Sequence, residues 1–125
     1  MAHILIIDDD KHIRDLLRKV LEGAGYNVAD APNGRIAMRM WREDPADLII
    51  TDILMPEQDG LEFIRELRRD VPDAKIIALS GGSQRLNLDT LDIARRFGAL
   101  NTLNKPFEIK DLLEAVRAAI AMNGS

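Results

Sequence analysis

Residues 4–10 read ILIIDDD, four consecutive aliphatic residues followed at once by three aspartates. So short an apolar run, bounded by charge, is typical of a strand that is covered on both faces of a sheet. After the aspartates, apolar residues recur at the spacing of one helix face: Ile13, Leu16, Leu17, Val20 and Leu21. A buried strand followed by an amphipathic helix predicts the first βα unit of an α/β domain.

The same alternation continues along the chain, and punctuating residues separate its elements. Gly23 and Gly25 end the first helix, Asn33 is placed to cap the second, and Pro45 and Pro72 follow the second and third. We expect strands at residues 4–7, 26–29, 48–50, 76–79 and 99–103, and helical apolar faces over 13–21, 36–41, 61–67, 86–97 and 109–120. This order predicts a doubly wound, five-stranded parallel sheet with five helices, formed by a single domain over residues 1–125.

The composition argues against several classes of function. The chain has no cysteine, so it has neither a disulfide nor a thiolate nucleophile, which is compatible with a reducing, cytoplasmic compartment. A formal charge of −4 and an aromatic content of 4% argue against direct binding of nucleic acid. The N-terminal apolar run is too short to span a membrane, so we expect no membrane association.

Polar residues stand at four of the predicted strand ends. Asp8 and Asp9 follow the first strand, Asp52 ends the third, Ser80 follows the fourth, and Lys105 follows the fifth. Ligands of such sheets bind at the carboxyl ends of the strands, so these side chains are expected to share one edge. If the first and third strands are neighbours, three carboxylates converge and require a cation or a proton. All-oxygen ligands with room for water suit Mg²⁺.

A lysine and a hydroxyl beside a metal site favour a phosphoryl group as the ligand, because both stabilise its negative charge. Asp52 is then the candidate nucleophile, since a carboxylate can attack phosphorus to form an aspartyl phosphate. Each feature also has a plainer interpretation. Residues 8–10 suit a helix N-terminus, with Asp10 as its cap, while Ser80 suits a turn and Lys105 a loop.

In order and spacing, these motifs resemble the response-regulator receiver domains of two-component signalling, over essentially the whole chain. Besides residues 4–10, the motifs are TDILMP at 51–56 with a DG turn at 59–60, ALSG at 78–81 and KPF at 105–107. Each motif is weak alone, and their combination is specific. The resemblance implies a flavodoxin-like sheet with strand order 2-1-3-4-5.

The resemblance also implies the chemistry of the site. Asp52 would accept a phosphoryl group from a phosphohistidine of a sensor histidine kinase or histidine phosphotransfer protein. Asp8 and Asp9 would hold Mg²⁺ with Asp52 and the backbone carbonyl of Leu54, Asp9 directly and Asp8 through water. The chain would thus be a regulatory phosphoacceptor that catalyses only its own phosphorylation and dephosphorylation.

Ser80 and Lys105 would contact phosphate oxygens, and the peptide between Lys105 and Pro106 would be cis. The unphosphorylated protein is expected to be a monomer that signals to an output domain or downstream protein through the fourth helix, fifth strand and fifth helix. Two residues depart from the family pattern. Thr102 replaces the usual switching aromatic residue and Asn104 an aliphatic one, which affects how the signal leaves rather than how phosphate is accepted.

Three other functions are weighed against this one. A haloacid-dehalogenase-type phosphohydrolase would need an Asp-x-Asp-x-Thr motif, which residues 8–12 do not match. A flavodoxin-like nucleotide-binding domain would need a phosphate-binding loop after the first strand, where three aspartates would repel phosphate. A pseudo-receiver that never takes phosphate would normally lack a site residue, and none is missing.

Overall fold

The computed structural model describes residues 2–52, 59–80, 101–104 and 107–121. Five parallel strands form one sheet in the order β2-β1-β3-β4-β5, which confirms the predicted fold class and strand order. The strands are β1 (His3–Ile7), β2 (Asn27–Ala31), β3 (Leu48–Asp52), β4 (Ile76–Ser80) and β5 (Asn101–Asn104). The described helices are α1 (Lys11–Gly23), α2 (Gly34–Glu43), α3 (Asp59–Asp70) and α5 (Ile109–Ala121). The helix predicted over residues 86–97 lies outside the described residues.

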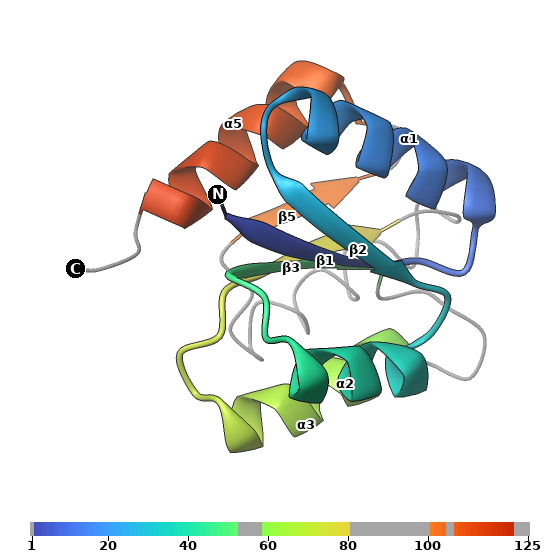
Figure 1. Ribbon diagram of the computed structural model, residues 1–125, viewed down its shortest axis with the longest axis vertical. Coiled ribbons are helices and arrows are strands. Elements are labelled where there is room, and N and C mark those ends of the chain that lie inside the picture. Colours follow the sequence, from blue (N-terminus) through green and yellow to red (C-terminus); the bar gives the residue numbers. More distant parts are fainter. Residues whose placement is uncertain (1, 53–58, 81–100, 105–106, 122–125) are drawn as a thin grey trace.

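Helices cover both faces of the sheet. Figure 1 shows α1 and α5 on one face and α2 and α3 on the other. Successive residues of β1 alternate between the two layers, because side chains of a strand point to opposite faces in turn. Ile4 and Ile6 pack with α1 and α5, whereas Leu5 and Ile7 pack with α2 and α3. This double burial explains why residues 4–7 of the strand are all aliphatic.

Local sequence signals set the ends of the first two helices. The Asp10 carboxylate accepts a hydrogen bond from the His12 backbone N–H at 2.9 Å and caps α1, as expected for that residue. The Asn33 side chain caps α2 in the same way through the N–H of Ile36, also at 2.9 Å. After α1, Gly25 adopts a φ of +99°, a conformation that favours glycine over residues with a side chain.

Some predicted boundaries were wrong. The second strand, expected at 26–29, is Asn27–Ala31, and the fifth, expected at 99–103, extends to Asn104, with residues 99 and 100 outside the described part of the chain. The end of β2 was misplaced because the charged Asp30 suggests a loop. In the structure its charge is compensated by ion pairs with Arg14 and Arg18. Residues 59–60, expected in a turn, begin α3.

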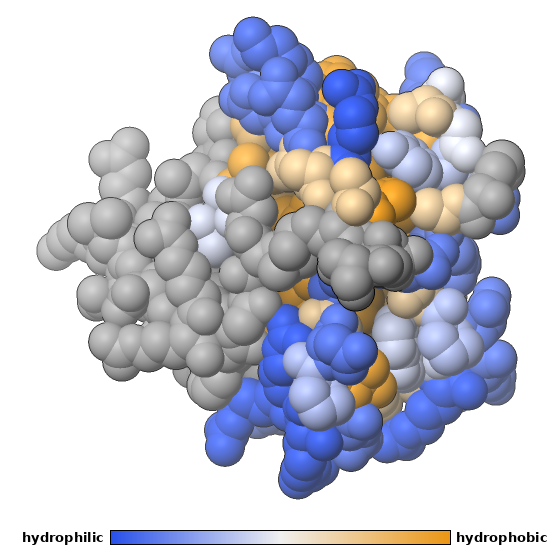
Figure 2. All heavy atoms as spheres, turned by 90° about the vertical axis from the view of Figure 1, so that its left-hand side faces the viewer, coloured by the Kyte–Doolittle hydropathy of each residue, from blue (hydrophilic) through white to orange (hydrophobic). Residues whose placement is uncertain are grey.

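The edge at which the strands begin lies opposite the carboxyl edge that carries the aspartates. Figure 2 looks onto it and shows polar side chains above and below, with hydrophobic side chains visible between them. No helix in the described part of the chain is long and apolar enough to cross a membrane.

Candidate functional site

Strand register brings the predicted acidic residues together. β1 pairs in parallel with β3, with Ile7 opposite Thr51, so Asp8 and Asp52 occupy the next positions along neighbouring strands. Carboxylate oxygens of Asp8, Asp9 and Asp52 lie within 4.8 Å of one another. The side chains differ in exposure, because Asp8 is 0% and Asp52 4% exposed, whereas Asp9 is open to solvent. The site therefore has two buried carboxylates and one that is accessible to solvent.

Several hydrogen bonds fix the position of Asp8. Its backbone N–H donates to the carbonyl of Ala31 at 3.2 Å, which extends the pairing of β1 with β2 beyond Ile7. Its backbone carbonyl accepts from a guanidinium nitrogen of Arg14 at 2.7 Å. One carboxylate oxygen also accepts from the backbone N–H of Asp10 at 2.9 Å. Asp8 is thus anchored through both its backbone and its side chain.

Asp52 is the last residue of a fully buried strand. All five residues of β3 are buried, and the Thr51 hydroxyl donates to the backbone carbonyl of Asp52 at 3.1 Å. Asp52 stands opposite Leu79 of β4, so it lies between β1 and β4 at the carboxyl edge of the sheet. A central, buried position leaves little freedom for this residue to move away from Asp8.

The remaining predicted site residues have different outcomes. Ser80 is the last residue of β4 and pairs with Asn104, the last residue of β5. The structure therefore places Ser80 at the carboxyl edge of the sheet, and its predicted contact with phosphate stays a prediction. Leu54, Lys105 and the peptide to Pro106 lie outside the described residues.

The charges of this cluster define what it can bind. Like charges at such short range disfavour one another, and burial of two of them makes the repulsion stronger than it would be in water. A hard divalent cation relieves this repulsion, and carboxylate oxygens are the ligands that Mg²⁺ prefers. Asp9 is exposed, so the cluster is accessible to solvent from its side. Asp8, Asp9 and Asp52 consequently fit a Mg²⁺ site.

An ion-pair network that was not predicted from the sequence reaches this site. Arg14 of α1 pairs with Asp30 of β2 at 3.2 Å, and Asp30 also pairs with Arg18 at 2.8 Å. Arg18 pairs in turn with Glu22 at 3.3 Å. Only the last of these pairs has the four-residue spacing that can be recognised within a helix.

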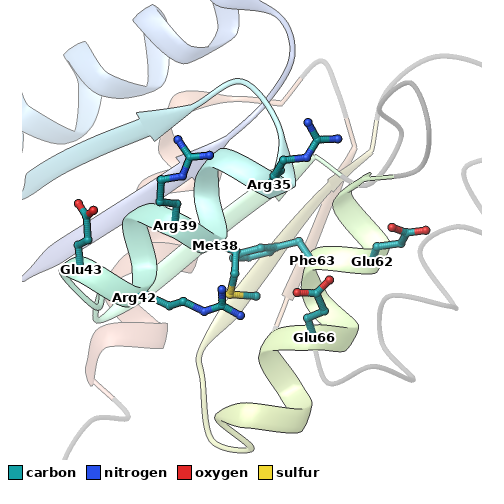
Figure 3. Close-up of a pocket in the computed structure, with 9 residues that line it drawn as sticks. Arg35, Met38, Arg39, Arg42, Glu43, Glu62, Phe63 and Glu66 are labelled. Atoms are coloured by element: carbon teal, nitrogen blue, oxygen red, sulfur yellow. The ribbon is translucent and has the colours of Figure 1, made fainter.

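A separate groove of about 500 Å³ lies between α2 and α3, and none of the three carboxylates lines it. Figure 3 shows arginines of α2 and glutamates of α3 around it, with Met38 and Phe63 at its base. Its charged residues have both signs: Arg35, Arg39, Arg42, Glu43, Glu62 and Glu66. Of these two places in the described part of the chain, it is the strand ends that combine buried like charges with the topology of an α/β ligand site.

The sheet order 2-1-3-4-5 defines a flavodoxin-like α/β domain. The aspartates clustered at the carboxyl ends of β1 and β3 give this domain an acidic site. The family model described as response regulator receiver domain matches residues 4–117. The chain therefore belongs to the receiver-domain family of two-component systems, whose members are regulatory phosphoacceptors.

Relatives and solved structures agree with this assignment. The response regulator receiver protein CpdR of Brucella abortus is 39% identical over 117 residues, which cover 93% of this chain and 94% of CpdR. The DNA-binding transcriptional regulator NtrC of Azospirillum brasilense is 36% identical over 98% of this chain, which corresponds to only 25% of NtrC. A receiver domain protein of Clostridium thermocellum has a similar structure, with a TM-score of 0.89, 32% identity and coverage of 98% of this chain and 96% of that one.

Proposed function

We propose that Asp52 is the phosphoacceptor of this receiver domain and that residues 1–125 form one such domain. The phosphoryl donor is a phosphohistidine of a sensor histidine kinase or a histidine phosphotransfer protein. The observation that carries the proposal is the approach of three carboxylates within 4.8 Å at the carboxyl ends of β1 and β3. The family match supports the same chemistry.

In the proposed reaction, a carboxylate oxygen of Asp52 attacks phosphorus as the bond between phosphorus and the donor imidazole nitrogen breaks. The electron pair of that bond stays on the imidazole, and the product is an acyl phosphate on Asp52. Burial of Asp52 in β3 holds the nucleophile in one position, which favours in-line attack. Hydrolysis of the acyl phosphate returns the carboxylate and resets the domain.

Asp8 and Asp9 would hold Mg²⁺ with Asp52 and the backbone carbonyl of Leu54. When bound, Mg²⁺ supplies positive charge that stabilises the transferring phosphoryl oxygens. Ser80 and Lys105 would contact the same oxygens from the ends of β4 and β5. Relatives such as NtrC, longer than this chain, support control of an output domain or downstream protein. We place that contact on the predicted fourth helix, β5 and α5, in a cytoplasmic protein that is monomeric before phosphorylation.

Intact-mass measurement after incubation with acetyl phosphate tests the proposal. The wild-type protein should gain the mass of one phosphoryl group when Mg²⁺ is present and gain none when EDTA replaces it. Asp52→Asn should gain none in either condition, whereas Glu66→Gln, a change in an exposed residue of α3, should behave as wild type. A folded wild-type protein that takes no phosphoryl group would instead identify a pseudo-receiver.

A further inference from the structure

The guanidinium of Arg14 bridges the acidic site and the end of β2. One of its terminal nitrogens donates to the Asp8 backbone carbonyl at 2.7 Å, while its Nε contacts an Asp30 carboxylate oxygen at 3.2 Å. The Arg14 side chain is only 15% exposed and that of Asp30 only 24%. Charge-assisted hydrogen bonds in such a shielded position are stronger than surface ion pairs.

The carbonyl that Arg14 contacts belongs to the peptide between Asp8 and Asp9. Because a peptide unit is planar, fixing this carbonyl fixes the nitrogen of Asp9 as well. The backbone N–H of Asp8 is already bound to Ala31 of β2. Residues 30 and 31 of β2 therefore control the peptide groups on both sides of Asp8, one directly and the other through Arg14.

Arg18 holds the other side of this bridge. It contacts the second oxygen of Asp30 at 2.8 Å and pairs with Glu22 at 3.3 Å, so Asp30 is fixed between two arginines. A planar guanidinium donates in two fixed directions, which lets Arg14 contact Asp30 and the Asp8 carbonyl together. A lysine ammonium lacks this planar fork and would not impose the same geometry.

We propose that Arg14, locked by Asp30 and Arg18, is a positioning residue that orients the Asp8–Asp9 peptide for Mg²⁺ binding. This inference rests on the proposed function. Arg14 contacts a backbone carbonyl and acts on the metal through the two aspartates. Its positive charge alone would weaken Mg²⁺ binding, so its contribution comes from geometry and opposes its electrostatic effect.

Geometry and charge predict opposite changes in Mg²⁺ affinity when Arg14 is replaced, so the direction of the change distinguishes them. Isothermal titration with Mg²⁺ would compare wild type, Arg14→Gln and the matched control Lys19→Gln, which removes one positive charge from an exposed position of the same helix. Positioning predicts a dissociation constant about fivefold higher for Arg14→Gln and within about twofold of wild type for Lys19→Gln. Charge alone predicts tighter binding by both variants, and most of all by Arg14→Gln. Equal or tighter binding by folded Arg14→Gln would overturn the inference.

Arg14→Lys keeps the charge and provides a second variant if Arg14→Gln does not fold; it should also bind Mg²⁺ more weakly than wild type. In both Arg14 variants, phosphorylation by acetyl phosphate should need a higher Mg²⁺ concentration to reach half of its maximal rate. The maximal rate itself should be nearly unchanged. A purely structural defect would lower the maximal rate instead and would contradict the inference.

Wild type that binds Mg²⁺ but takes no phosphoryl group would contradict the proposed function alone. Wild type that binds no Mg²⁺ would overturn both.

Discussion

The strand-end site and the α2–α3 groove are both rich in charge, but their charges are arranged differently. At the strand ends, Asp8 and Asp52 are buried within 4.8 Å of each other and of Asp9. In the groove, exposed charged residues of both signs line the helices α2 and α3 (Figure 3). Exposed charges of both signs are solvated and offset one another, whereas carboxylates clustered at buried strand ends provide oxygen ligands for a divalent cation. The arrangement of charge, rather than the volume of a hollow, therefore identifies the functional site.

The largest expected effect on stability concerns the base of the groove. Phe63 is 3% exposed and packs into the core between the sheet and the helices α2 and α3. Phe63→Ala should lower the free energy of unfolding by about 3 kcal/mol, because it leaves a cavity, and should leave Mg²⁺ affinity within about twofold of wild type. Urea denaturation and Mg²⁺ titration would measure both. A large loss of Mg²⁺ affinity would show that the groove and the strand-end site are coupled.

The next effect concerns the accessible carboxylate of the strand-end site. Asp9→Asn should raise the Mg²⁺ dissociation constant at least about tenfold, since loss of a metal ligand exceeds the effect of changes around the ligands. Glu62→Gln provides the matched change in the groove and should leave the affinity unchanged. Isothermal titration measures both, and equal effects of the two substitutions would remove the distinction between the regions.

Repulsion among the carboxylates should be visible without metal. In EDTA, Asp9→Asn should raise the free energy of unfolding by about 1 kcal/mol, because it removes one of three clustered charges. Glu66→Gln should change it by less than about 0.5 kcal/mol. With Mg²⁺ at about 100 times its dissociation constant, wild type should gain about 2.7 kcal/mol and become the more stable protein. Thermal melts that show no such reversal would contradict a repulsive, metal-binding cluster.

The smallest effect comes from an exposed ion pair on α1. A hydrogen bond from Lys11, 2.9 Å long, lowers the pKa of the Asp15 carboxyl below its ordinary value. A lowered pKa in the folded state contributes stability above the unfolded-state pKa, and this contribution is lost as the pH falls through the folded-state value. Lys11→Met should therefore differ from wild type slightly at neutral pH and not at all in strong acid. The difference should also vanish in about 1 M salt, and its persistence there would argue against an exposed pair.

Most of the strand-end site was predictable because parallel strands bring their carboxyl ends to one edge. The apolar runs located β1 and β3, and the aspartates after those runs had to meet once the strands were neighbours. Asp10 and Asn33 were predictable as caps because capping depends on residues two or three positions away.

The network around Arg14 was not predictable in this way. Arg14 and Asp30 are 16 residues apart, and their contact depends on the packing of α1 against the end of β2. Asp30 also led to a wrong predicted end for β2, since a charged residue in a short strand suggests a loop unless its ion-pair partner is known. The contacts of Ser80 and Lys105 with phosphate stay predictions that follow from the ends of β4 and β5.

Backbone amide NMR during a Mg²⁺ titration tests directly whether Mg²⁺ binds at the strand ends, because it observes the strand-end site and the groove in one sample. Binding at the strand ends should produce saturable shifts that are largest at Asp8, Asp9 and Asp52 and absent from the exposed residues of the α2–α3 groove. Shifts centred on the groove, or no shifts at the strand ends of a folded protein, would contradict it.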